Sequence, residues 1–324
     1  MQITRQLGGL VLMPLILASA CKSAEKPDEF IHAVAKAAQG EPAALFDALP
    51  PSYQKDAQGV VAAFAAKVPE RAWDDSFVLA GKAVRVFETK KEFILAHPAL
   101  AGTVKPEDAA KAWDPTVRTL STLVKSDLST VAGLKKLDLR KFLAGPVAAI
   151  VEDIVKTAEI ASTVVPRAGA PKIGDLRAKL TTMKTTVEKV DGDKASVKIE
   201  MEGEKLETQE MVKIEGKWIP KELAAAWPGA INGAKMAIAA IQIEPEMLVQ
   251  FNGMKGMIDP ALDGLLAAKT QDEFNAQIDA VMKATIGKPG AQVAEAAEPA
   301  PTPPPEAAAK PAKGKKSKRS RNRQ

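Results

Sequence analysis

Residues 191–219 read DGDKASVKIEMEGEKLETQEMVKIEGKWI, a segment that distinguishes an α+β fold from an all-helical one. Residues 195–201 alternate apolar and polar side chains, and this period of two predicts a strand with one buried and one solvated face. Three glycines flanked by charged residues mark tight turns between successive strands: Gly192, Gly203 and Gly216. We therefore predict an antiparallel meander of three or four strands over about residues 184–219.

Helical patterns lie on both sides of this meander. Aromatic residues make up 4% of the chain and alanine is abundant, which favours closely packed helices over a β-sandwich. Thr270 and Glu273 form a capping box, and Ser52 after Pro50-Pro51 is a candidate helix cap. We interpret four further prolines as openings of helices: Pro115, Pro146, Pro228 and Pro260.

The expected fold class is α+β, with a predominantly helical body, the small meander and a disordered C-terminal tail. The helical region covers residues 28–175, and the meander with the C-terminal helices covers residues 176–288. We expect these two segments to form one compact unit. A signal peptide at 1–20, a lipidated tether at 21–27 and a low-complexity tail at 289–324 complete the chain.

The last predicted hairpin carries a family resemblance. Residues 212–218, VKIEGKW, resemble the final hairpin of small exported domains with a cone-like helix-and-sheet fold, the NTF2-like group. The resemblance covers residues 184–219, about 35 of the 324 residues. The long helical N-terminal half departs from the pattern of that group.

The N-terminal segment has the layout of an export signal. Arg5 precedes an apolar run from Leu7 to Leu17, which is too short to span a bilayer as a helix. Residues 18–20, Ala-Ser-Ala, lead into Cys21, the one cysteine of the chain. This arrangement resembles the lipobox of bacterial lipoproteins, with alanine where leucine is commoner three residues before the cysteine. The resemblance implies that Cys21 becomes the first residue of the mature protein and carries acyl chains such as palmitate.

Lipidation at Cys21 implies export and anchoring in a membrane of the cell envelope, because more than one acyl chain anchors a protein stably. Lys22 follows the cysteine, which favours the outer membrane under the common sorting rule. Alternatively, the same small residues fit the general signal peptidase, and Cys21 is then a free N-terminal thiol. Neither alternative leaves a cysteine for a disulfide, so packing must hold the body together.

The basic charge of the chain is concentrated at its C-terminus. The net charge is +5, and eight basic residues follow a Pro/Ala-rich segment: Lys310, Lys313, Lys315, Lys316, Lys318, Arg319, Arg321 and Arg323. Residues 21–294 carry 36 basic and 37 acidic side chains and are essentially neutral. Such a tail attracts polyanions in a salt-dependent way. Export argues against nucleic acid, so the expected targets are envelope polymers or lipids that carry negative charge. The alternative is a solubilising tail without a specific partner.

Catalytic and metal-binding motifs are missing from the sequence. His32 and His97 are isolated, and neither adjacent carboxylate pair, Asp74-Asp75 or Glu152-Asp153, points to one side of a helix. We therefore predict no cofactor and no metal site. Two tetrapeptides look alike, Arg-Ala-Trp-Asp around Trp73 and Lys-Ala-Trp-Asp around Trp113, and we interpret this similarity as a coincidence in an alanine-rich chain.

We expect a non-enzymatic binding or scaffolding protein that is exported, lipid-anchored and able to contact envelope polyanions through its tail. The main alternative is a carrier of an apolar small molecule, in a cavity between the meander and the following helices. Its candidate surface consists of Trp227, Met247, Phe251, Met254 and Met257, although core packing is the simpler interpretation of the methionines. The third alternative is an enzyme whose site assembles from scattered carboxylate, lysine and arginine side chains.

Overall fold

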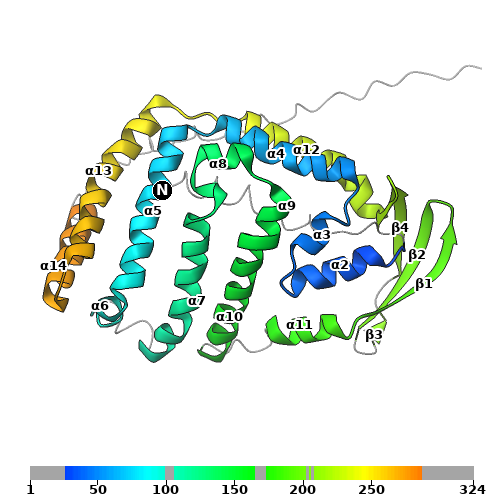
Figure 1. Ribbon diagram of the computed structural model, residues 1–324, viewed down its shortest axis with the longest axis horizontal. Helices are drawn as coiled ribbons and strands as arrows, with labels where there is room; N and C mark the ends of the chain where they lie inside the picture. Colours follow the sequence, from blue (N-terminus) through cyan, green and yellow to red (C-terminus); the bar gives the residue numbers. More distant parts are fainter. Residues whose placement is uncertain (1–25, 99–105, 165–172, 202–203, 206–207, 287–324) are drawn as a thin grey trace, which may run out of the picture. The chain divides into compact units, whose positions relative to one another are not determined.

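The computed structural model describes residues 26–98, 106–164, 173–201, 204–205 and 208–286. Cys21, the predicted signal segment and the basic tail from Lys310 to Arg323 therefore lie outside the described residues. The α+β fold class with a predominantly helical body is confirmed (Figure 1). Contacts group the described residues through Val281 into one compact unit.

The first helices precede and follow the Pro50-Pro51 break. Their bounds are α2 Glu29–Ala38, α3 Ala43–Phe46, α4 Pro51–Lys67, α5 Glu70–Thr89, α6 Lys91–Leu95 and α7 Pro106–Val124. Shorter elements then lead into a long helix: a 3-10 turn Asp127–Ser129, α8 Val131–Lys136, α9 Leu139–Phe142, a π-helical turn Leu143–Val147 and α10 Ala148–Val164. Helix α11, Ile173–Thr181, precedes the sheet. Three helices follow the sheet: α12 Lys221–Ala239, α13 Pro245–Ala267 and α14 Gln271–Ile286.

The predicted meander forms one antiparallel sheet in the order β1-β2-β4-β5. Its strands are β1 Lys184–Asp191, β2 Lys194–Met201, β4 Gln209–Ile214 and β5 Lys217–Pro220, and a two-residue strand β3, Glu204–Lys205, pairs with the end of β2. The alternation in β2 is confirmed, because Ala195 and Val197 are buried and their neighbours are more exposed. A bulge after Val187 interrupts the register of the edge strand β1.

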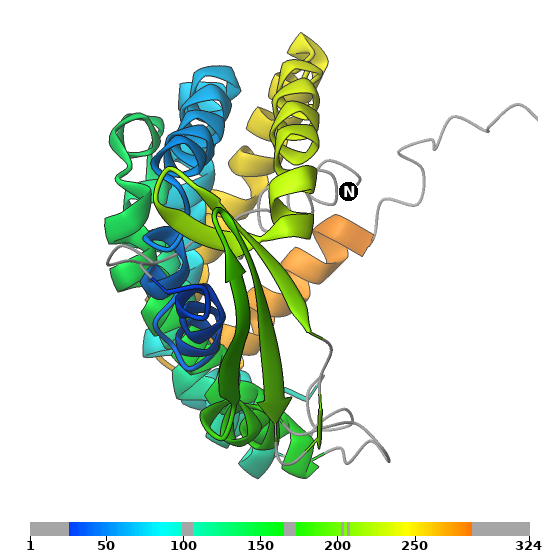
Figure 2. The same ribbon diagram turned by 90° about the vertical axis from the view of Figure 1, so that its right-hand side faces the viewer.

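The buried face of the sheet covers the largest hydrophobic core. Val197, Met211 and Ile219 from the sheet belong to one cluster of buried residues with Phe30 of α2 and Leu139 of α9. Helix α12 also packs against β4 and β5, while α2 packs against β5 (Figure 2). The sheet therefore closes one core to which α2, α3, α4, α9 and α12 all contribute.

A row of long helices extends from this core. Helix α13 packs on α5, α5 on α7, and α7 on α10, so each inner helix of the row touches a neighbour on either side (Figure 1). Smaller clusters close the row: Phe64, Val131 and Ile238 are buried together where α4 meets α8. Phe274 and Leu265 are buried together where α14 meets α13.

The prolines do not open helices, and that prediction is wrong. Pro115, Pro228 and Pro260 lie inside α7, α12 and α13, and Pro146 lies in the π-helical turn before α10. An internal proline lacks an N–H and leaves the carbonyl four residues earlier without its helical partner. For Pro228 this carbonyl belongs to Ala224, and it accepts a hydrogen bond from the Tyr53 hydroxyl at 3.5 Å. A distant side chain thus takes over from the missing backbone donor.

Two helix starts differ in how their first N–H groups are satisfied. The capping box of α14 is confirmed: Glu273 N–H donates to Thr270 Oγ1 at 3.3 Å, and the Glu273 carboxylate accepts from Lys269 N–H at 2.7 Å. These backbone donors lower the pKa of Glu273 below its usual value. Ser52, by contrast, does not cap α4, because it lies inside the first turn.

The cap of α4 comes from the sheet. Glu215 Oε2 accepts a hydrogen bond from Ser52 N–H at 2.8 Å, and Glu215 lies in the β4–β5 turn. Glu215 has a positive φ of 50° and Gly216 one of 82°, as the tight hairpin requires. The turn therefore points a carboxylate at the positive end of a helix, where it meets Ser52, 163 residues earlier in the chain.

We expect Tyr53→Phe to lower the free energy of unfolding by about 1 kcal/mol, because it removes the donor to the Ala224 carbonyl. The phenyl ring preserves the stacking on Trp227, in which the ring centroids lie 4.4 Å apart. In a Pro228→Ala background residue 228 regains its N–H, so the same substitution costs less. Urea unfolding of the four proteins of this double-mutant cycle measures the coupling, and additive effects contradict the assignment.

Candidate functional site

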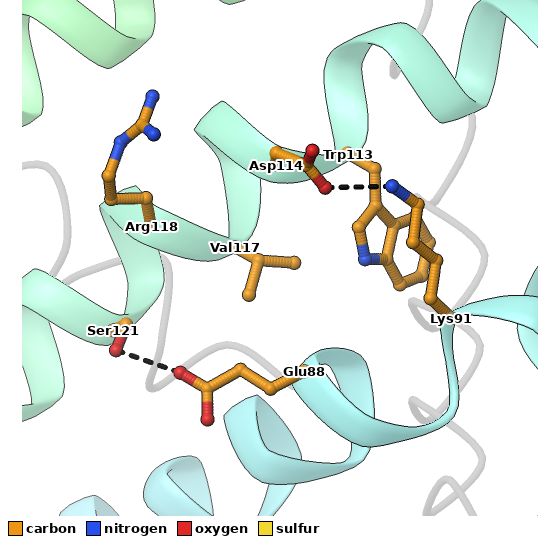
Figure 3. A pocket seen from close by; sticks show the side chains of 7 residues that line it. All are labelled: Glu88, Lys91, Trp113, Asp114, Val117, Arg118 and Ser121. Carbon is orange, nitrogen blue, oxygen red and sulfur yellow. Dashed lines mark hydrogen bonds and ion pairs between the residues drawn. The ribbon is translucent and has the colours of Figure 1, made fainter.

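A polar hollow lies between α5 and α7 and has a volume of about 310 Å³. Helix α5 contributes Glu88, α6 contributes Lys91, and α7 contributes the remaining residues (Figure 3): Trp113, Asp114, Val117, Arg118 and Ser121. We refer to these seven residues as the Trp113 hollow. They combine an indole, a branched apolar side chain, a hydroxyl, two carboxylates and two cations.

The indole of Trp113 is held in place on two sides. Its Nε1–H donates to the carbonyl of Phe87 at 3.2 Å. Its ring meets the ring of Phe87 edge-on, with centroids 5.9 Å apart and an interplanar angle of 80°. Edge-to-face pairs of this kind are favourable beyond the area that they bury. The indole is therefore a rigid wall of the hollow, while the Val117 side chain points into the space beside it (Figure 3).

The charged groups of the hollow have partners. Lys91 Nζ donates to Asp114 Oδ1 at 2.8 Å, and Ser121 Oγ donates to Glu88 Oε1 at 3.0 Å (Figure 3). Arg118 donates from Nε and Nη2 to Asp153 of α10, at distances of 2.6–2.9 Å. These bonds raise the pKa of Arg118 above its ordinary value. Positive and negative charge thus balance around the hollow, and this pairing serves binding and positioning better than proton transfer.

A second hollow between the same two helices is almost wholly apolar. Its volume is about 270 Å³. It is lined by Ser76 and eight apolar residues, namely Phe77, Ala80, Ala83, Val84, Phe87, Leu120, Leu123 and Val124. We refer to it as the Phe77 hollow. Ser76 also donates its hydroxyl to the Trp73 carbonyl at 2.6 Å, so the polar group of this lining is already engaged.

The predicted apolar surface is not assembled as one site. Trp227 is 7% exposed, stacks on Tyr53 and donates its Nε1–H to Asp56 at 3.2 Å, so it belongs to the core under the sheet. Met247, Phe251, Met254 and Met257 lie on α13, which packs against α5. Met254 and Met257 are 49% and 51% exposed, so the core-packing interpretation is wrong for these two.

The carboxylate pairs point apart, as predicted, and each member braces a different contact. Asp74 accepts a hydrogen bond from Val131 N–H at 2.8 Å and caps α8, whereas Asp75 pairs with Lys255 of α13 at 2.8 Å. Glu152 pairs with Arg177 of α11 at 3.1 Å, while Asp153 binds Arg118. The Arg177 guanidinium lowers the pKa of the Glu152 carboxyl. These carboxylates therefore join helices.

Of the two histidines, His32 has a polar contact on the sheet. Its Nε2 lies 3.0 Å from Thr185 Oγ1 and 3.6 Å from Asp28 Oδ2. Thr185 also donates its hydroxyl to Asp28 at 3.0 Å. Asp28 and His32 therefore meet Thr185 at the same hydroxyl, so the three groups do not form the relay of a catalytic triad. His97 follows the end of α6.

Among the residues that the structure describes, no group of three or more histidine, cysteine or acidic side chains is placed to hold a metal ion. No helix within the described ranges is long and apolar enough to cross a membrane. Comparison with protein-family models, curated proteins and solved structures finds no match to this chain.

The Trp113 hollow was not predicted from the sequence, although the two similar tetrapeptides contained a signal. Trp73 donates its Nε1–H to the Leu128 carbonyl at 2.8 Å and meets Phe64 edge-on at 5.6 Å. Trp113 likewise donates its Nε1–H to a backbone carbonyl, that of Phe87, and meets the Phe87 ring edge-on. The two tryptophans thus share an N–H bond to a carbonyl and an edge-on phenylalanine, while Trp73 also contacts Phe77, and of the two, Trp113 lines the polar hollow.

We expect Arg118→Met to destabilise the protein clearly more than Lys91→Met. Arg118 is the partner of Asp153, whose side chain is 4% exposed, and a buried carboxylate without a partner is strongly unfavourable. Lys91 pairs with Asp114, which is 72% exposed and returns to water when its partner is lost. Thermal unfolding of both variants gives the comparison, and equal melting temperatures contradict it.

Proposed function

We propose that this chain is a non-enzymatic binding and scaffolding protein of the bacterial cell envelope. Acyl chains on Cys21 tether it to a membrane, with the outer membrane favoured by Lys22, and the basic tail contacts anionic polymers or lipids. The observation that carries this proposal is the combination of a lipobox-type cysteine and eight clustered cations in one chain. The two features supply a membrane anchor and an electrostatic contact.

The charged groups of the helical row support a scaffold. Lys82 of α5 binds Asp259 and Asp263 of α13, and Lys255 of α13 binds Asp75 of α5. Asp259 and Asp263 also raise the pKa of Lys82, through hydrogen bonds to its ammonium group. Ionisable side chains at these helix contacts therefore bind each other and brace α13 against α5, as a rigid scaffold requires.

A second candidate function is a carrier of an apolar small molecule. The Phe77 hollow favours it, because eight of its nine lining residues are apolar and its volume is about 270 Å³. Its place between α5 and α7 differs from the place expected from the sequence. Ligand pockets typically start at about 300 Å³, so the occupant is a short aliphatic chain or a small ring.

The anchor is tested by intact mass spectrometry of the protein extracted from membranes, with Cys21→Ser beside the wild type. We expect a mature mass that begins at Cys21 and includes acyl chains, and we expect the variant to lose both the acylation and the membrane association. An unacylated mature wild type contradicts the tether and leaves a freely diffusing exported protein.

The tail is tested with vesicles, in the Cys21→Ser background so that no acyl chain contributes. Each tail cation adds about 1 kcal/mol near an anionic surface. Replacing the eight cations with glutamine is therefore expected to weaken binding to phosphatidylglycerol vesicles at least about tenfold at low salt. Phosphatidylcholine vesicles are the neutral control, and circular dichroism checks the fold. Equal binding of both proteins to anionic vesicles overturns the role of the tail.

A further inference from the structure

We infer that the Trp113 hollow binds the ring of a neutral sugar within a glycan chain. The inference goes beyond the proposed function, because it assigns a ligand to the folded body and depends on neither the anchor nor the tail. It rests on the rigid indole, on the paired polar groups and on the size of the hollow.

The apolar part of the lining suits one face of a sugar ring. The C–H groups of a pyranose carry a small positive charge, and the face of an indole is negative, so the two attract each other. Trp113 is fixed by its bond to the Phe87 carbonyl and loses little freedom on binding. Val117 extends this apolar surface beside the indole (Figure 3).

The polar part of the lining suits hydroxyl groups. A carboxylate offers about four acceptor sites and a lysine three donors. The pair of Lys91 with Asp114 and that of Glu88 with Ser121 each involve one oxygen of the carboxylate. The second oxygens of Glu88 and Asp114 remain able to accept from sugar hydroxyls while both pairs stay intact.

Charge balance selects a neutral ligand. A phosphate or carboxylate in the hollow gains from Lys91 and Arg118 about what it loses to Glu88 and Asp114, and an ammonium the reverse, so neither recovers the cost of leaving water. A zwitterion must first break the ion pair between Lys91 and Asp114, and only then can it form one new ion pair with each of these two side chains. A polyhydroxylated ring avoids all three costs, because it bonds to groups of either sign without displacing them.

The dimensions agree with one or two rings of a longer chain. A volume of about 310 Å³ lies at the lower end of the range for ligand pockets. The hollow is open to solvent, so a ring bound there can carry the neighbouring residues of a glycan chain outside it. A ring bound in this way belongs to a polymer that continues along the surface.

Trp73 provides a matched control for Trp113. Both indoles donate to a backbone carbonyl of another element, and both meet a phenylalanine edge-on. Trp113→Leu and Trp73→Leu therefore both remove an indole N–H bond and an edge-on phenylalanine contact, and Trp73→Leu also removes the contact of Trp73 with Phe77, so Trp73→Leu is the stricter control for lost packing. Of the two substitutions, Trp113→Leu removes a wall of the polar hollow.

The experiment titrates the full-length protein with chitotetraose, cellotetraose and maltotetraose by isothermal calorimetry, with D-alanyl-D-alanine as the zwitterionic probe. We expect at least one tetrasaccharide to bind and the dipeptide not to bind. Trp113→Leu lowers the affinity at least about tenfold, and Trp73→Leu changes it less than about twofold. Binding is equal at low and high salt, since the ligand is neutral.

Asp114→Ala keeps the test decisive if Trp113→Leu does not fold. Asp114 is highly exposed, so its loss leaves the fold intact, and we expect sugar affinity to fall at least about threefold. Binding of the dipeptide in preference to every glycan overturns the inference, as does the absence of binding by all three glycans. An equal effect of the two tryptophan variants, or no effect of Asp114→Ala, overturns it too. Replacing the tail cations with glutamine is expected to leave sugar binding unchanged. A failure of the sugar-binding inference can therefore be distinguished from a failure of the proposed role of the tail.

Discussion

Gln58 of α4 donates from Nε2 to the carbonyl of Leu137 at 2.6 Å, and its Oε1 accepts from Leu139 N–H at 3.0 Å. One side chain thus satisfies the end of α8 and the start of α9, about eighty residues further along the chain. The same constraint recurs throughout the protein, because many short helices present many backbone groups that need partners. Glu215 in the β4–β5 turn caps α4 in a comparable way, and Asp74 of α5 caps α8, each from an element far away in the sequence. The fold depends on these long-range bonds, since no cysteine among the described residues cross-links the helices.

Features that depend on neighbouring residues were predictable from the sequence. The period of two in residues 195–201 and the spacing of Thr270 and Glu273 each specify a local geometry, and the structure confirms both. The prolines show the limit of this reasoning. A proline fits the first turn of a helix and also persists inside one when its lost hydrogen bond is replaced. For Pro228 the replacement comes from Tyr53, 171 residues away from Ala224. No window of the sequence around Pro228 contains that information.

The candidate binding surfaces also depend on contacts between residues far apart in the sequence, which the sequence alone does not reveal. In the sequence, Trp227 and the methionines of α13 have one common interpretation, yet Trp227 is buried because Tyr53 stacks on it and Asp56 accepts its N–H. Met254 and Met257 remain exposed because the contact of α13 with α5 involves other faces, including Lys255 and Asp259. The Trp113 hollow needs α5, α6 and α7 together, so it has no local signature beyond the tetrapeptide that it shares with Trp73.

The two hollows have a common cause in the order of side-chain sizes along the α5–α7 contact. Trp113, Val117 and Ser121 follow one stripe of α7 at four-residue spacing and decrease in size towards Ser121, which binds Glu88. In the Phe77 hollow, Phe77 and Phe87 stand at either end of α5 residues that include two alanines, Ala80 and Ala83. Large side chains at a contact hold two helices apart, and small side chains between the large ones leave unfilled space. In a row of helices no third helix covers that space. The polar side chains that border the first space and the apolar ones that line the second then determine which chemistry each hollow can accept.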